Sequence, residues 1–319
     1  PDIIHIHQLH GYYLNYEILF EYLAQKNTPI VLTLHDCWTF TGHCAYFDSV
    51  GCNKWKTECN NCPLLKEYPK SYLLDNSTSN YNLKKKLFNS IPNMQIVTVS
   101  NWLSQLVGSS FLKEIPRKVI YNGIDTNVFS PKGKPDDYPF KEELKDKYII
   151  LGVASPWNYR KGLDDFIKLS KLLLKNEVIV LIGLSKKQIK SLPKNIVGIE
   201  KIKEKALLAN YYRNSNLFIN FSIEETFGLT TVESMSCGTP VVVYNSTACP
   251  EIVSEGTGFI VEKNDILAVR KIINQLKSNL NDTISSDNCV NWVVQKFDSK
   301  DRFKEYIKLY SRTVNNIKD

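Results

Sequence analysis

The segment 222–243 combines two carboxylates with a glycine where a predicted strand leads into a predicted helix. Glu233 lies about one helical turn in, where a carboxylate can accept hydrogen bonds from a ribose diol. Glu225 precedes the turn and can face the sugar end of the same ligand. Backbone amides at a helix N-terminus favour an anion such as phosphate, and here they belong to Phe227, Gly228, Leu229 and Thr230. The alternative is that Glu225 and Glu233 are a solvated pair at a helix entry.

A second group of reactive side chains lies between residues 37 and 63 and ends in a Cys-x-x-Cys pair. Four thiolates can hold a structural zinc tetrahedrally, with no open position for catalysis. The first residues lack the basic and apolar pattern of a signal peptide, so we expect a reducing compartment, which favours metal over disulfides. Disulfides and free thiols stay open as alternatives. The predicted zinc ligands are Cys44, Cys52, Cys59 and Cys62.

Histidines are confined to the first part of the chain. A buried-strand pattern over 30–34 ends in His35, so this side chain is expected at the carboxyl end of a strand, where α/β sheets bind ligands. The alternative is a strand-end histidine that satisfies a local carbonyl. His5 and His7 share one strand face and are expected to be structural, whereas His10 is a candidate for a site at the same sheet end.

The elements that must position these residues alternate between short β-branched runs and amphipathic segments of helical length. The first part predicts strands over 3–7, 30–34 and 96–99 and helices over 14–25, 83–88 and 101–107. The later part predicts strands over 148–153, 178–182, 217–221 and 240–244, with helices over 162–175, 204–213, 229–236 and 297–314. Such alternation is typical of parallel sheets covered on both faces.

The chain of 319 residues is long enough for two domains. We expect the α/β fold class, with two Rossmann-like domains that face a cleft. The first (1–130) carries the cysteine-rich insertion 37–63, and a Pro- and Gly-containing linker (131–147) leads to the second domain (148–296). The helix at 297–319 can pack back on the first domain. The first domain contains few strand–helix units and begins in mid-strand, so we expect it to be truncated at its N-terminus.

Segment 222–243 resembles the Glu-x7-Glu motif of retaining GT-B glycosyltransferases of family 4. Three further segments are similar to that family in the same order: 119–129 with its Asn-Gly-Ile-Asp, Arg160-Lys161-Gly162-Leu163, and Gly256-Thr257-Gly258-Phe259. The similarity spans most of residues 1–280. With His-Asp-Cys-Trp at 35–38, the pattern looks closest to bacterial exopolysaccharide transferases of the colanic-acid type.

The resemblance implies specific roles for several residues. Glu233 would bind the ribose of a nucleotide-diphosphate sugar, Glu225 the hydroxyls of the donor sugar, and Lys161 the diphosphate. His35 would act near the donor sugar and the acceptor hydroxyl. The family usually has an arginine six residues before the lysine, where this sequence has Ser155, so Arg160 is the candidate for the second cation. No catalytic divalent metal is expected.

Composition excludes other classes. No apolar run reaches the ~18 residues that span a bilayer. The net charge of +7 is mild and forms no basic stripe, so a small anionic ligand fits better than nucleic acid. The resemblance implies a glycosyltransferase that moves a sugar to a glycan or lipid-linked acceptor in surface polysaccharide synthesis, and we expect it to be cytoplasmic. Peripheral membrane contact through 84–88 is a further hypothesis. The alternatives are a nucleotide-sugar epimerase and a non-catalytic, zinc-stabilised module that binds glycan or nucleic acid.

Overall fold

The computed structural model describes residues 1–11, 13–133, 138–278 and 283–318. The chain forms two compact units. The first comprises Pro1–Tyr121 together with the residues from Arg302 onward, and the second comprises Asn122–Asp301. Part of the predicted linker, residues 134–137, lies outside the described residues.

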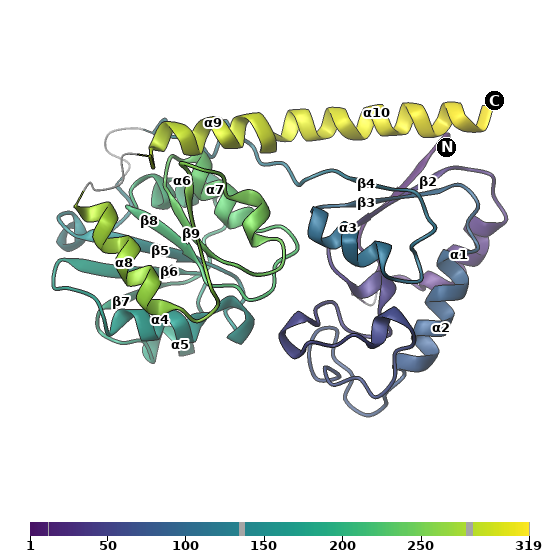
Figure 1. Ribbon diagram of the computed structural model, residues 1–319, viewed down its shortest axis with the longest axis horizontal. Coiled ribbons are helices and arrows are strands. Elements are labelled where there is room, and N and C mark those ends of the chain that lie inside the picture. Colours follow the sequence, from purple (N-terminus) through teal and green to yellow (C-terminus); the bar gives the residue numbers. More distant parts are fainter. Residues whose placement is uncertain (12, 134–137, 279–282, 319) are drawn as a thin grey trace. The chain divides into compact units, whose positions relative to one another are not determined.

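The first unit is built on a parallel four-stranded sheet in the order β1-β2-β3-β4 (Figure 1). All five residues of β2 are buried, as expected for a central strand covered on both faces. Its strands are β1 (Ile4–Ile6), β2 (Ile30–Leu34), β3 (Met94–Thr98) and β4 (Arg117–Val119), and its connecting helices are α1 (Tyr16–Ala24), α2 (Ser77–Phe88) and α3 (Asn101–Gly108).

The C-terminal helix α10 (Ser299–Lys318) contributes to the first unit from Arg302 onward. Leu309 packs in one cluster with Val31, Val97 and Ile120 of the sheet. The hydroxyl of Tyr310 lies 2.5 Å from Nδ1 of His5. The C-terminal helix α10 therefore packs on the sheet of the first unit and completes its hydrophobic core.

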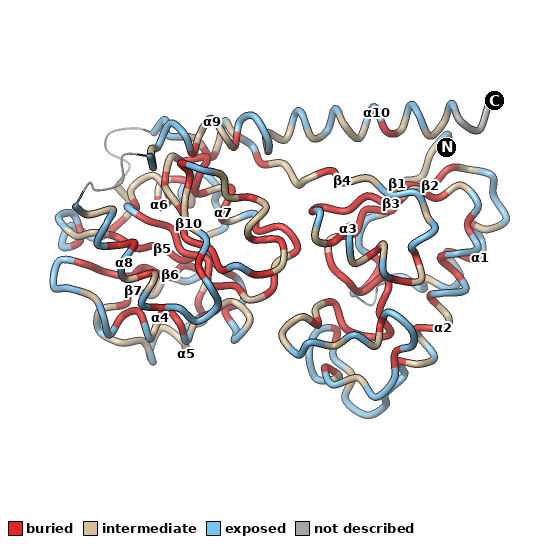
Figure 2. Tube along the Cα trace, viewed as in Figure 1, coloured by how far each residue is buried: buried red, intermediate tan, exposed pale blue. Residues whose placement is uncertain are grey.

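The second unit is a parallel six-stranded sheet in the order β10-β9-β8-β5-β6-β7. Buried residues run along its central strands (Figure 2). The strands are β5 (Tyr148–Val153), β6 (Glu177–Ile182), β7 (Ile196–Ile199), β8 (Leu217–Asn220), β9 (Val241–Tyr244) and β10 (Gly258–Val261). The helices are α4 (Leu163–Ser170), α5 (Lys186–Lys190), α6 (Lys205–Arg213), α7 (Leu229–Ser236), α8 (Ile266–Lys277) and α9 (Ser286–Phe297).

The order of this second sheet contains a topological switch point. From β5 the chain proceeds outward through β6 and β7, and it then returns to β8 on the other side of β5 and proceeds through β9 and β10. The chain therefore turns to opposite sides after β5 and after β8, and in α/β sheets the carboxyl edge at such a switch point is where ligands bind. Lys161 follows β5 and Glu225 follows β8.

The structure confirms the predicted α/β class and corrects several element boundaries. The helix predicted over 162–175 ends at Ser170, and the one predicted over 83–88 already begins at Ser77. The helix predicted to begin at Phe297 begins at Ser299, because α9 ends at Phe297 and Asp298 has an extended backbone. Strands β4, β7 and β10 were not predicted, and they are only three or four residues long.

The burial of Lys84 narrows the hypothesis of lipid contact through 84–88, because only Lys85 and Lys86 of this segment are exposed. The side chain of Lys84 is buried, and its ammonium donates to the carbonyls of Trp38 at 2.7 Å and Thr41 at 2.9 Å. Leu87 and Phe88 are also buried, because this face of α2 packs on the unit's core. Lys84 thus holds the cysteine-rich insertion against α2 and cannot contact lipid.

Candidate functional site

The turn after β5 brings Lys161 to the carboxyl edge of the second sheet. The side chain of Asn158 accepts a hydrogen bond from the Lys161 amide at 3.2 Å, and Gly162 ends the turn with φ +73°. A Cβ on Gly162 would lie 2.4 Å from Cβ and 2.5 Å from the carbonyl oxygen of Phe221, just beyond β8. Only glycine lets the two loops approach this closely.

Lys161 and Glu225 form an ion pair between these two loops. Both side chains are largely buried, with 19% and 14% of their surface exposed. Burial on its own raises the pKa of Glu225, but the ammonium of Lys161 and the guanidinium of Arg160 lower that pKa overall. Glu225 is therefore held ionised, which suits hydrogen bonds to ligand hydroxyls.

Arg160 anchors the loop that carries Glu225. Its guanidinium donates to the carbonyl of Glu224 at 2.7 Å, and its own carbonyl accepts from the amide of Ile223 at 2.9 Å. Its role as the second cation for a diphosphate stays a prediction. Its contacts make it a positioning residue for the loop.

The N-terminus of α7 lies three residues beyond Glu225. Gly228 is its N-cap with φ +102°, and a Cβ there would come within 3.1 Å of Ile252. Phe227 is buried and Leu229 is 43% exposed. The amides at the start of a helix have no partner within it, so the predicted anion-binding amides of this turn, including that of Thr230, begin beside the Lys161–Glu225 pair.

Glu233 lies one turn into α7 and has an environment opposite to that of Glu225. Burial raises its pKa to about 7, even though a hydrogen bond at 3.0 Å from the hydroxyl of Tyr212 and the charge of Lys205 both lower it. The carboxyl group thus takes up a proton near neutral pH. A ligand diol that donates to it would favour the ionised form.

Sequence reasoning missed three residues that support this site. Asn220 ties the end of β8 to α7 through a bond to the Thr231 hydroxyl at 3.1 Å. The hydroxyl of Thr247 accepts from the amide of Glu225 at 2.9 Å, and Tyr212 binds Glu233. The position of Asn220, a polar residue at the end of a strand, is a weak sequence signal for a role in the site. The sequence around Tyr212 and Thr247 carries no such signal, because these residues reach the site from other elements.

A wide-open cavity of ≈670 Å³ lies at residues 189–211 of the same unit, around the loop between β7 and α6. Its lining includes Glu200, Leu207 and Tyr211. The cavity adjoins α6, the helix that also carries Tyr212 to Glu233.

In the first unit, His35 follows β2 as predicted from the strand pattern. Its Nε2 lies 3.0 Å from Nδ1 of His7, and the two rings stack with centroids 5.3 Å apart. Burial and the neighbouring His7 lower the pKa of His35. His5 contacts Thr33 at 2.8 Å and has its pKa lowered to about 4 by burial and by His7 and His35. The three imidazoles are thus kept neutral at neutral pH.

The cysteine-rich insertion brings its thiols to one small enclosed cavity, lined by Cys44, Cys52, Cys59 and Cys62. A hydrogen bond between Cys44 and Cys62 raises the pKa of the former and lowers that of the latter to about 7. The structure joins none of the eight cysteines in a disulfide. No three His, Cys, Asp or Glu side chains form a metal site in the described ranges, so the structure gives the zinc prediction no support.

The two parallel α/β units match solved structures over nearly the whole chain. Sucrose-phosphate synthase from Thermosynechococcus elongatus aligns with a TM-score of 0.70 at 18% identity, over 98% of this chain and 73% of that one. Anabaena Alr3699/HepE, solved in complex with UDP, aligns with a TM-score of 0.69 at 18% identity, over 93% and 76%. The protein therefore has the GT-B fold.

Residues 135–291 match the family described as glycosyl transferases group 1. Over 84% of its length the chain is 28% identical to a protein from Escherichia coli K12 named as a colanic acid biosynthesis glycosyl transferase, WcaC. Over 62% of its length the chain is also 26% identical to an E. coli protein named UDP-Gal:alpha-D-GlcNAc-diphosphoundecaprenol alpha-1,3-galactosyltransferase. The chain spans 65% and 54% of these relatives' lengths. Its second unit thus contains a glycosyl transferases group 1 domain.

Proposed function

We propose that the protein is a retaining glycosyltransferase that moves a sugar from a nucleotide-diphosphate sugar to a glycan or lipid-linked acceptor in surface polysaccharide synthesis. The observation that carries the proposal is the Lys161–Glu225 pair at the switch point, beside the N-terminus of α7. The family match and the relatives' names support the same activity.

The donor's diphosphate would lie over the first amides of α7 and against the ammonium of Lys161. Transfer breaks the bond between the sugar's anomeric carbon and the diphosphate, and negative charge grows on the leaving group. Fixed positive charge there stabilises the transition state, often the largest single contribution to catalysis. The new bond forms between the anomeric carbon and the acceptor oxygen, whose proton passes to the leaving phosphate.

The two glutamates would hold the two ends of the donor. Glu225, held ionised, accepts hydrogen bonds from hydroxyls of the donor sugar. Glu233 accepts from the ribose diol and gives up its proton when the ligand binds. Solved structures of HepE contain UDP and UDP-glucose, which favours a uridine nucleotide as the first donor to test.

His35 is proposed to orient the acceptor hydroxyl from the carboxyl end of β2. Its neutral imidazole can donate or accept a hydrogen bond. A lipid-linked acceptor is favoured by the name of the E. coli galactosyltransferase, whose acceptor is a diphosphoundecaprenol. Among the helices of the described ranges, none combines the length and the apolar composition needed to cross a bilayer.

The proposal is tested by calorimetric titration with UDP and a panel of nucleotide sugars. Saturable binding is expected, and Glu233→Ala should abolish it while leaving the circular dichroism spectrum unchanged. The anomeric configuration of the product, read by NMR, then checks retention. Salt-sensitive binding of DNA or RNA with no nucleotide-sugar binding would instead favour a non-catalytic module.

A further inference from the structure

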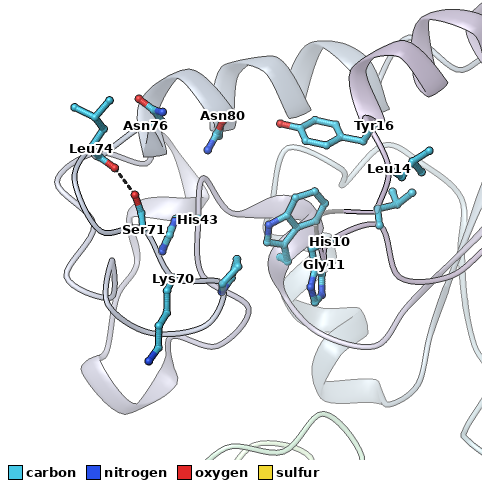
Figure 3. A pocket seen from close by; sticks show the side chains of 13 residues that line it. His10, Gly11, Leu14, Tyr16, His43, Lys70, Ser71, Leu74, Asn76 and Asn80 are labelled. Carbon is cyan, nitrogen blue, oxygen red and sulfur yellow. Dashed lines mark hydrogen bonds between the residues drawn. The ribbon is translucent and has the colours of Figure 1, made fainter.

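The first unit contains a cavity of ≈280 Å³ to which neither the sequence motifs nor the relatives assign a ligand (Figure 3). It lies at the carboxyl end of the sheet. His10 and Leu14 follow β1 and Trp38 follows β2, while Asn76 and Asn80 come from the start of α2. The loop 69–74, which leads from the cysteine-rich insertion to α2, closes another side.

Besides the charged Lys70, the lining offers neutral hydrogen-bonding groups that the protein does not use itself. In the described part of the chain the side-chain amides of Asn76 and Asn80 form no hydrogen bond, and Asn76 does not cap α2. Nε2 of His43, a residue only 9% exposed, also has no partner there. A buried polar atom without a partner is costly unless a ligand or water completes it. By contrast, His10 is already bonded to Asp36 at 2.6 Å.

Aromatic side chains also line the cavity. Tyr16 meets Trp38 edge-on with ring centroids 5.4 Å apart, and the ammonium of Lys84 fixes Trp38 from 3.3 Å. Apolar rings combined with a few neutral amides suit a sugar ring, which has apolar C–H faces and hydroxyls around its edge. The volume is just below the range of ~300–1,000 Å³ for drug-sized ligands, so the cavity suits a small headgroup.

The rim of the cavity is apolar and exposed. Tyr72, Leu73 and Leu74 are 86%, 94% and 68% exposed, and Leu74 itself lines the cavity, at the end opposite Leu14 (Figure 3). Three consecutive exposed apolar residues are unfavourable in water unless they serve a function. Tyrosine and leucine beside a polar pocket form a surface suited to the interface of a lipid bilayer.

We infer that this cavity holds the sugar headgroup of a membrane lipid while Tyr72, Leu73 and Leu74 insert into the bilayer beside it. The polar groups inside and the apolar rim then match the two halves of one amphiphile. The inference rests on the proposed function, since it makes this lipid the acceptor. It adds an apolar contact to the lipid contact proposed through 84–88, where only Lys85 and Lys86 are exposed.

Vesicle co-sedimentation of the full chain tests the inference. Vesicles of phosphatidylcholine and phosphatidylglycerol are compared with the same vesicles containing glucosyl diacylglycerol. We expect the protein to bind both and to bind the glycolipid vesicles more tightly. Leu73→Asp should weaken binding to both about 10-fold or more, because an inserted leucine side chain is replaced by a charge. Asn80→Ala should bind plain vesicles normally and lose the gain from glycolipid.

Leu267→Asp is the matched control, since Leu267 is 66% exposed on α8 of the second unit. Asn76→Ala, at an exposed position, repeats the pocket test should Asn80→Ala fold poorly. The inference is overturned if the protein does not bind vesicles, if Leu267→Asp is as damaging as Leu73→Asp, or if glycolipid adds nothing. UDP titration of Leu73→Asp should match the wild type. Loss of UDP binding by the wild type would instead count against the proposed function alone.

Discussion

At the scale of residues, the candidate donor site depends on two carboxyl groups with opposite proton affinities. The ion pair with Lys161 and the charge of Arg160 lower the pKa of Glu225 against the effect of burial. Glu233 is buried beside a tyrosine hydroxyl and has its pKa raised to about 7. One carboxylate is thus ready to accept hydrogen bonds, whereas the other must first lose a proton.

The raised pKa of Glu233 predicts that UDP binding releases a proton. A ribose diol binds the ionised carboxylate better, so UDP affinity should rise with pH up to about 7 and then level off. Calorimetry in buffers of different ionisation enthalpy measures the released proton. Glu233→Gln should bind UDP more weakly and show no such dependence. A pH-independent affinity in the wild type would contradict this assignment.

Removing the cation of the ion pair should affect stability and binding separately. Lys161→Met leaves Glu225 without its partner and should destabilise the second unit by about 1–3 kcal/mol, less than for a fully buried pair because both side chains are partly exposed. The double variant Lys161→Met/Glu225→Gln should recover most of this loss, since no unpaired charge remains. UDP should still bind poorly to it, because the diphosphate has lost its ammonium. Denaturant unfolding and calorimetry report the two effects.

At the scale of elements, the topological switch point between β5 and β8 decides where the site forms. Gly162 and Gly228 shape the two loops that meet there. The close approach at Gly162 depends on both its left-handed backbone and the absence of a side chain. Gly51 has a similar backbone, with φ +58°, but nothing within 4 Å of its hypothetical Cβ.

This contrast separates backbone strain from steric exclusion. Gly51→Ala should cost about 1 kcal/mol of unfolding free energy, the strain of a left-handed alanine. Gly162→Ala should cost about 3 kcal/mol or more, because Phe221 and its loop must move, and it should also weaken UDP binding. Equal losses in thermal or denaturant unfolding would show that the loops are not tightly packed.

The histidines on β1 and β2 predict a pH dependence for the first unit. The pKa of His5 is lowered to about 4, and the pKa values of His7 and His35 are also lowered. Below pH ~6.5 the unfolded chain takes up protons that the folded unit resists. Stability should therefore be fully present above that pH and fall as the pH drops towards 4. His5→Gln, which removes one of these groups, should show a shallower fall in circular dichroism melts.

At the scale of the whole molecule, the chain folds as two units, and its C-terminal helix completes the first one. The proposed donor site lies entirely in the second unit. The pocket proposed for a lipid-linked sugar lies entirely in the first. Each can therefore be tested without disturbing the other.

Ligand-induced stabilisation should reveal this division. UDP at 100 times its dissociation constant should stabilise the unit that binds it by about 2.7 kcal/mol. In differential scanning calorimetry we expect the unfolding temperature of the second unit to rise and that of the first unit to stay unchanged. The Glu233→Ala variant supplies the control with no shift. A single transition that moves as a whole would mean that the units unfold together.

The fold class and the motifs around Gly228 and Gly162 could be predicted from the sequence, because strand–helix alternation and glycine turns are local properties. Three other features came from the folded structure alone: the pair between Lys161 and Glu225, 64 residues apart, the bond from Tyr212 to Glu233, and the burial of Lys84. Partners from distant elements, and the burial that sets a pKa, depend on how strands are ordered and helices packed. Local sequence does not encode either directly.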